Sequence, residues 1–117
     1  MALKAYQKAQ AAAETPRNTE YRLFGQVTGA LIDANRAGTK GKPLLDAIDW
    51  NRRMWGALAG DCMSDSNGLS RELRAQIVSL SIWVNKYSSE VMHKNAPIDP
   101  LIDVNRNIMQ GLQQQAA

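Results

Sequence analysis

The chain has 117 residues, of which 44% are apolar and 21% charged, and its formal net charge is +3. This composition is typical of one globular domain, here residues 1–117, and excludes a disordered chain. The small positive excess is scattered along the sequence, which disfavours a dense nucleic-acid-binding surface. A single cysteine excludes an internal disulfide and favours a reducing compartment. Because no segment approaches the ~20 apolar residues that cross a membrane, and the N-terminus lacks a signal peptide, we expect a cytoplasmic protein.

Helix signals recur along the chain, and strand signals are nearly absent. Proline and glycine separate segments in which apolar residues follow a helical spacing. In chain order, we expect helices over Leu3 to about Ala13, from Pro16 to Ala37, from Pro43 to Cys62, from a cap at Ser70 to about His93, and from a cap at Asp99 to Leu112. The first of these is rich in Ala, Lys and Gln and has few apolar side chains to bury.

The segment after Ser70 has the clearest helical pattern. Its apolar residues alternate spacings of four and three, as in a helix that packs in a bundle. They are Leu73, Ile77, Leu80, Val84, Tyr87 and Val91. Four amphipathic helices joined by short loops predict an all-α fold. We therefore expect an antiparallel four-helix bundle preceded by a short N-terminal helix.

A pentapeptide, Ile-Asp-x-Asn-Arg, is repeated along the chain. It occurs three times, at Ile32–Arg36, Ile48–Arg52 and Ile102–Arg106, and Ile82–Lys86 is a looser fourth copy. On a helix, Asp and an Arg three positions later share a face. Asn and Asp are poor residues for the middle of a helix, because their side chains compete for the backbone. Two interpretations stay open: local salt bridges with hydrogen bonds between helices, or a face that contacts a partner.

The residue types that catalysis or metal binding needs are scarce. A metal site takes three or four ligands, which one Cys and one His cannot supply. Cys62 lies on an apolar helix face, where a buried and unreactive thiol is expected. His93 is at the end of a helix, where a cation suits the helix dipole. We therefore expect no enzyme activity and no metal, cofactor or small-molecule ligand.

Glycines inside the expected helices form two G-x-x-x-G patterns, one with Gly25 and Gly29 and one with Gly56 and Gly60. Each glycine costs a helix roughly 1 kcal/mol relative to alanine. One interpretation is close packing between helices. The other is a loosened bundle that opens to admit a helix from another protein.

Four residues are candidates for contact with a partner protein. Trp50 lies off the main apolar line of its helix and beside Arg52 and Arg53. Tryptophan with neighbouring arginines is a common composition of binding hot spots. Tyr6, on the weakly apolar first helix, is either a docking anchor or a simple packing residue.

Several longer segments carry a recognisable pattern. They are Ala5-Tyr6-Gln7-Lys8-Ala9-Gln10, Asp49-Trp50-Asn51-Arg52-Arg53-Met54-Trp55, Ser79-Leu80-Ser81-Ile82-Trp83-Val84 and Leu101-Ile102-Asp103-Val104-Asn105-Arg106. With them, nearly the whole chain resembles the FlaF family of flagellar biosynthesis regulators from alphaproteobacteria. The resemblance implies a cytoplasmic helper protein linked to flagellin synthesis and secretion, which works with or against FlbT, a regulator of flagellin translation. A weaker likeness, carried by Tyr6-Gln7 and Leu23-Phe24, is to FliS, a helical chaperone that holds the C-terminal part of flagellin.

The resemblance leads us to expect a protein that binds flagellin and, with FlbT, couples its export to post-transcriptional control of its synthesis. Apolar grooves of the bundle would accept the amphipathic terminal helices of unassembled flagellin. Trp50, Arg52 and Arg53 would face the partner, and Tyr6 could occupy the empty groove. Two alternatives stay open: a translational regulator that binds the flagellin messenger RNA directly, or a scaffold for FlbT without flagellin contact.

Overall fold

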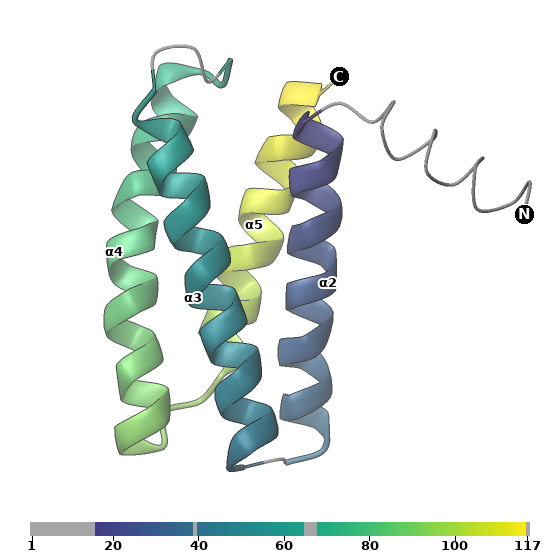
Figure 1. Ribbon diagram of the computed structural model, residues 1–117, viewed down its shortest axis with the longest axis vertical. Helices are drawn as coiled ribbons and strands as arrows, with labels where there is room; N and C mark the ends of the chain where they lie inside the picture. Colours follow the sequence, from purple (N-terminus) through teal and green to yellow (C-terminus); the bar gives the residue numbers. More distant parts are fainter. Residues whose placement is uncertain (1–15, 39, 65–67, 117) are drawn as a thin grey trace, which may run out of the picture.

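The computed structural model describes residues 16–38, 40–64 and 68–116, except for the side chains of 16–18 and 115–116. Four helices account for most of these residues: α2 (Pro16–Arg36), α3 (Lys42–Cys62), α4 (Arg71–Lys94) and α5 (Asp99–Ala116). Consecutive helices run in opposite directions, and no strand occurs in these ranges (Figure 1). The predicted all-α antiparallel four-helix bundle is therefore confirmed for this part of the chain. The predicted N-terminal helix over Leu3 to Ala13 lies outside the described residues.

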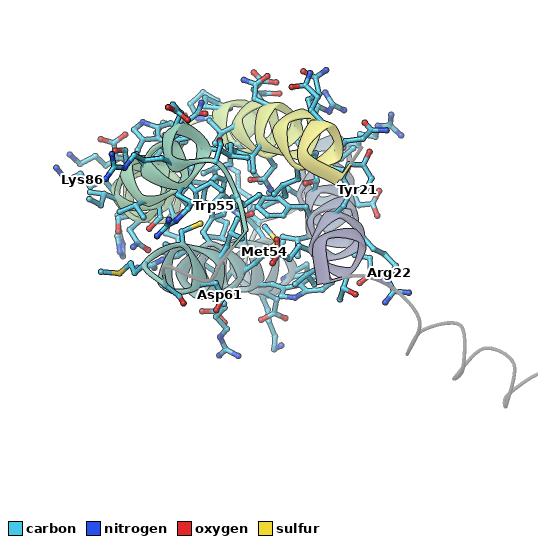
Figure 2. All side chains as sticks on the ribbon, turned by 90° about the horizontal axis from the view of Figure 1, so that it is seen from above. Tyr21, Arg22, Met54, Trp55, Asp61 and Lys86 are labelled. Atoms are coloured by element: carbon cyan, nitrogen blue, oxygen red, sulfur yellow. The ribbon has the colours of Figure 1, made fainter. Side chains whose placement is uncertain are left out.

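The helices pack in a ring, in which each helix contacts its neighbours in the sequence and α5 closes the ring against α2. The contact between α4 and α5 is the smallest of the four, and the backbones of diagonally opposite helices do not approach each other. Seen from the end, side chains such as Trp55 fill the space inside the ring, whereas Lys86 lies outside it (Figure 2). The centre of the bundle is therefore a side-chain core rather than a helix-to-helix contact.

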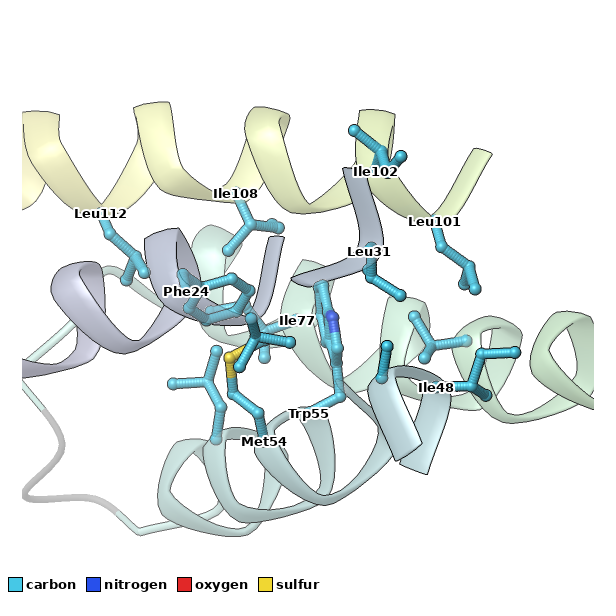
Figure 3. Close-up of a cluster of buried hydrophobic side chains, with 14 of the residues drawn as sticks. Phe24, Leu31, Ile48, Met54, Trp55, Ile77, Leu101, Ile102, Ile108 and Leu112 are labelled. Carbon is cyan, nitrogen blue, oxygen red and sulfur yellow. The ribbon is translucent and has the colours of Figure 1, made fainter. Parts of the chain in front are cut away.

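Large apolar side chains from all four helices form this core (Figure 3). Phe24 and Trp55 meet edge to face, with ring centroids 5.5 Å apart. Both are almost fully buried, as are Leu31, Ile48, Ile77, Leu101, Ile108 and Leu112. Burying a side chain of this size contributes about 1.5–3 kcal/mol, so the core supplies the main driving force for folding.

The starts of α3 and α4 follow the predicted signals, whereas Asp99, predicted as the cap of the last helix, is the first residue of α5 and accepts a hydrogen bond from Asn35. Ser70 caps α4, because its hydroxyl oxygen accepts the backbone N–H of Leu73 at 3.2 Å. Asn95 ends the same helix in a left-handed conformation, with φ 54°. Gly41 precedes α3 with φ 78°, a conformation that disfavours residues with a side chain, and Pro43 occupies the first turn.

The apolar line predicted along α4 is only partly buried. Leu73, Ile77, Val84 and Val91 are in the core, but Leu80 and Tyr87 are half-buried. Seven residues fall about 20° short of two full helical turns. The side of the line formed by Leu73, Leu80 and Tyr87 therefore rotates away from the core, whereas the side formed by Ile77, Val84 and Val91 stays in it. Consequently Ser88, and not Tyr87, is fully buried at this level. Tyr87 instead stacks on Trp83 and donates its hydroxyl to the Pro97 carbonyl, and partial burial raises its pKa above the usual value.

A hydrogen-bonded cluster of polar side chains lies inside the apolar core. Trp55 donates its indole N–H to Asn105 Oδ1 at 2.8 Å. Asn105 Nδ2 then donates to Asn51 Oδ1 at 2.8 Å and to Thr28 Oγ1 at 3.1 Å. All four side chains are buried. Since an indole can only donate, Asn105 must present its oxygen to Trp55 and its amino group to the others. This orientation leaves Asn51 Nδ2 without a partner among the described residues.

The cluster explains two copies of the repeated pentapeptide, because Asn51 and Asn105 are the asparagines of the second and third copies. The asparagines of the other copies also bond between helices. Asn35 donates to Asp99 at 3.1 Å, and Asn85 accepts from Arg52 Nε at 3.3 Å. The predicted hydrogen bonds between helices are therefore confirmed at all four positions.

The predicted Asp–Arg salt bridges within the pentapeptides are wrong. Asp49 pairs with Arg53, four positions later and at 3.0 Å, rather than with Arg52. In the described part of the chain, the corresponding pairs Asp33–Arg36 and Asp103–Arg106 form no ion pair. The side chain of Arg52 is used instead for the bond to α4.

The helical glycines do not behave as one class. A Cβ atom built on Gly25 would lie 3.7 Å from the Met109 side chain, which is an ordinary packing distance. Atoms built on Gly29, Gly56 and Gly60 would meet nothing within 4 Å. Close helix packing is therefore the wrong interpretation for these three glycines. Gly111 is different again, because its Cβ would lie 3.3 Å from Leu73 Cδ1.

We expect the polar cluster to be essential for stability. Replacing Asn105 by Ala leaves the buried Trp55 N–H, Thr28 and Asn51 without their partner, and should lower the free energy of unfolding by about 3 kcal/mol. Asn107, exposed on the same helix, is the matched control. Its replacement by Ala should be neutral or slightly stabilising, because alanine is the better helix former. Urea unfolding measures both, and equal changes would contradict the role of the cluster.

The glycines give a second prediction about stability. Gly56→Ala should raise the free energy of unfolding by roughly 0.5–1 kcal/mol, because the methyl group meets open space and alanine favours the helix. Gly111→Ala should raise the free energy of unfolding by less, or lower it, because the added methyl group presses on Leu73. Thermal and urea unfolding of both variants test this difference. A Gly111 variant as stable as the Gly56 variant would show that the close contact of α5 with Leu73 of α4 does not require glycine.

Candidate functional site

Two hollows lie between α2 and α3, and we call the surface that contains both of them the α2–α3 groove. The larger, of about 480 Å³, is lined by Ala30, Asp33, Ala34, Ala37, Pro43, Asp46, Ala47 and Trp50. The smaller, of about 110 Å³, is lined by Glu20, Leu23, Phe24, Met54, Ala57, Leu58 and Asp61. Four of the residues around the larger hollow are alanines, so the two helices cannot fill the space between their outer faces.

The groove exposes two large apolar side chains. Trp50, 40% exposed, borders the larger hollow, and Leu23, 36% exposed, borders the smaller one. Other exposed apolar residues lie elsewhere: Ile82 on α4 is 57% exposed and Met63 after α3 is 76% exposed. Leu45, 45% exposed, borders a separate hollow at one end of the bundle. Trp50 combines a large indole ring with a position beside a concave surface, which is where binding hot spots usually lie.

Carboxylates border the groove at both hollows. Glu20 and Asp61 line the smaller one, and Asp33 and Asp46 line the larger one. Asp46 pairs with Lys42 at 2.8 Å, and this hydrogen bond raises the pKa of Lys42 above its usual value. This acidic border contrasts with the positive charge of the whole chain.

The structure brings together two of the four predicted binding residues. Trp50 and Arg53 are three positions apart on the outer side of α3, so they share a face, and Arg53 is exposed while paired with Asp49. Arg52 is directed to α4, where it donates to Asn85. Tyr6 lies outside the described residues. Of the two arginines, Arg53 is therefore the one that shares an exposed face of α3 with Trp50.

A third hollow, not predicted from the sequence, lies at one end of the bundle. It has a volume of about 420 Å³ and forms where the end of α2, the start of α3 and the end of α4 meet. Its apolar lining includes Leu44, Leu45, Val91, Met92 and Ile98. It lies beside the loop that connects α2 to α3, and it is separate from the two hollows of the α2–α3 groove. No sequence pattern marks it, because its residues come from three separate helix ends.

Across residues 16–38, 40–64 and 68–116, no group of three His, Cys, Asp or Glu side chains is arranged to hold a metal ion. Cys62 is buried at the end of α3, and its backbone carbonyl accepts a hydrogen bond from Arg74 Nε at 2.9 Å. Within the same ranges, none of the helices has the length and apolar character needed to cross a membrane.

Comparison with known proteins gives one match. The sequence pattern of the family described as flagellar protein FlaF matches residues 2–112. Comparison with the curated proteins and with the solved structures finds no match. The family match spans nearly the whole chain, including both helices of the groove and both asparagines of the buried cluster. The chain therefore belongs to the FlaF family of flagellar proteins.

Proposed function

We propose that this protein is a non-enzymatic flagellar factor that binds flagellin before export. In this proposal an amphipathic helix of unassembled flagellin lies in the α2–α3 groove. Unassembled flagellin exposes apolar helix faces that would otherwise aggregate, and helix-in-groove binding covers such a face. The observation that carries the proposal is the exposure of Trp50 beside an open, alanine-lined hollow.

The groove has the parts that such a contact needs. The indole of Trp50 offers a large apolar surface, and Arg53 can exchange its pairing with Asp49 for a charge-assisted hydrogen bond to the partner. Because both are on the exposed side of α3, binding does not require the core to open. The weaker likeness to FliS agrees with this mode and stays a prediction.

The second part of the proposal concerns FlbT. We propose that the protein couples flagellin export to post-transcriptional control by binding FlbT as well as flagellin, so that RNA is contacted through FlbT. The carboxylates around the α2–α3 groove would repel RNA phosphates. Direct RNA binding at this surface is therefore the less favoured alternative, and a gel shift at low salt would detect it.

Replacing Trp50 by Ala tests the proposal. We expect the Kd for purified monomeric flagellin, measured by isothermal titration calorimetry, to rise at least about tenfold, because the apolar anchor is removed. The matched control is Ile82→Ala, which truncates a more exposed apolar side chain on α4. This control should bind like the unmodified protein, and circular dichroism should show both variants folded.

Two outcomes would contradict the proposal. Absence of flagellin binding at tens of micromolar, with or without FlbT, would remove flagellin as the partner. A Trp50 variant that loses only FlbT binding would instead support the scaffold alternative, in which flagellin is not contacted.

A further inference from the structure

The two hollows of the α2–α3 groove are spaced regularly along α3. The residues that α3 contributes to the smaller hollow, Met54, Ala57, Leu58 and Asp61, follow those of the larger hollow, Pro43, Asp46, Ala47 and Trp50, each by eleven positions. On α2, Leu23 and Ala34 are separated by the same number of positions. The two hollows therefore lie against the same face of α3, displaced along its axis by eleven residues.

This spacing matches the geometry of a partner helix. Eleven residues make about three helical turns and rise about 16 Å. Side chains eleven positions apart on a straight helix therefore point in the same direction. A single helix lying along the groove would place one such side chain in each hollow.

The region between the hollows limits what the partner can present there. The residues of α2 between Phe24 and Ala30, and those of α3 between Trp50 and Met54, line neither hollow. The space for large side chains of a partner helix is therefore in the two hollows, and we assign small side chains to the stretch between them. The hollows also differ in size, so the smaller suits an aliphatic side chain and the larger has room for an aromatic ring beside Trp50.

The charges around the groove indicate which charged side chains a partner helix should carry on its flanks. Each hollow has a carboxylate from α2 and one from α3: Glu20 with Asp61, and Asp33 with Asp46. Asp46 already pairs with Lys42, and Glu20 and Asp61 have interactions of their own, so a bound helix would share or exchange these contacts. Basic side chains on both flanks of a bound helix would lie close to these carboxylates, whereas acidic ones would be repelled.

We propose that the α2–α3 groove binds one helix of about 18 residues that carries two large apolar side chains eleven positions apart, small residues between them, and Lys or Arg on its flanks. The length corresponds to the groove from Glu20 to Ala37. This inference rests on the proposed use of the groove for a partner helix, and it adds the sequence pattern that the partner helix must have.

Three synthetic peptides of 18 residues test the pattern against the full chain. The first is built from Ala and Lys, with Phe at position 4 and Leu at position 15. The second has the same composition with Leu at position 13, which turns the two anchors to opposite faces. The third keeps the anchors of the first and replaces every Lys by Glu. Fluorescence anisotropy of labelled peptides gives the Kd of each.

We expect the first peptide to bind at least tenfold more tightly than the other two, and its Kd to rise with salt. Equal binding of the first two peptides would overturn the spacing, and equal or tighter binding of the Glu peptide would overturn the charge requirement. Filling the smaller hollow gives an independent check. Ala57→Leu should weaken the first peptide at least tenfold, whereas Ala75→Leu, at an exposed position on α4, should not.

The peptide and flagellin experiments test the inferred pattern and the proposed function independently. If Trp50→Ala weakens flagellin binding but the peptides show no preference for spacing, the proposed function stands and the inferred pattern is wrong. If the first peptide binds selectively and flagellin does not bind, the pattern stands and the groove serves another helical protein.

Discussion

The indole N–H of Trp55 is buried and donates to Asn105 Oδ1 at 2.8 Å. Because the indole cannot accept, its bond sets the orientation of the Asn105 amide, which in turn selects Asn51 and Thr28 as acceptors. These few directional bonds connect α2, α3 and α5 at one level. Apolar packing is not directional, whereas these hydrogen bonds hold the amide groups in one orientation, although Asn51 Nδ2 has no partner among the described residues. The helix α4 is held differently, by apolar packing and by peripheral bonds such as Arg52 to Asn85.

The same cluster determines the surface between α2 and α3. Thr28 and Asn51 belong to the two helices that border the α2–α3 groove, and both bond to Asn105 on the inner side. Their positions fix how far apart the two helices lie and how each is rotated. With that separation set from inside, alanines such as Ala30 and Ala47 are too small to close the outer side. The groove is therefore a consequence of how the core is bonded, and it exists before any partner binds.

The sequence predicted the helices and their ends well, because caps such as Ser70 and breaks such as Pro43 act locally. It also marked the pentapeptide asparagines as unusual, since asparagine inside an apolar helix needs a reason. It could not say which side chain Arg52 or Asp49 would pair with, because neighbouring spacings of three and four are both possible on a helix. The sequence could not predict the position of the α2–α3 groove, for a different reason. Its hollows depend on the rotation of α2 relative to α3, and no pattern within either helix encodes that rotation.

The geometry also decides between two ways of binding a helix. The glycine-rich helices suggested a bundle that opens to admit a partner between its own helices. Insertion of a helix between α5 and its neighbours α2 and α3 would separate Asn105 from Trp55 and Asn51. Each buried group left unsatisfied costs about 1–3 kcal/mol, in addition to the disrupted packing of the apolar core. A complex with micromolar affinity has only about 8 kcal/mol in total, so this cost would consume most of its binding energy. Binding along the outer groove leaves the core intact and requires only that Arg53 exchange an exposed ion pair, which is worth less than about 1 kcal/mol. Of these two modes, binding along the α2–α3 groove is therefore the one that costs the bundle less free energy.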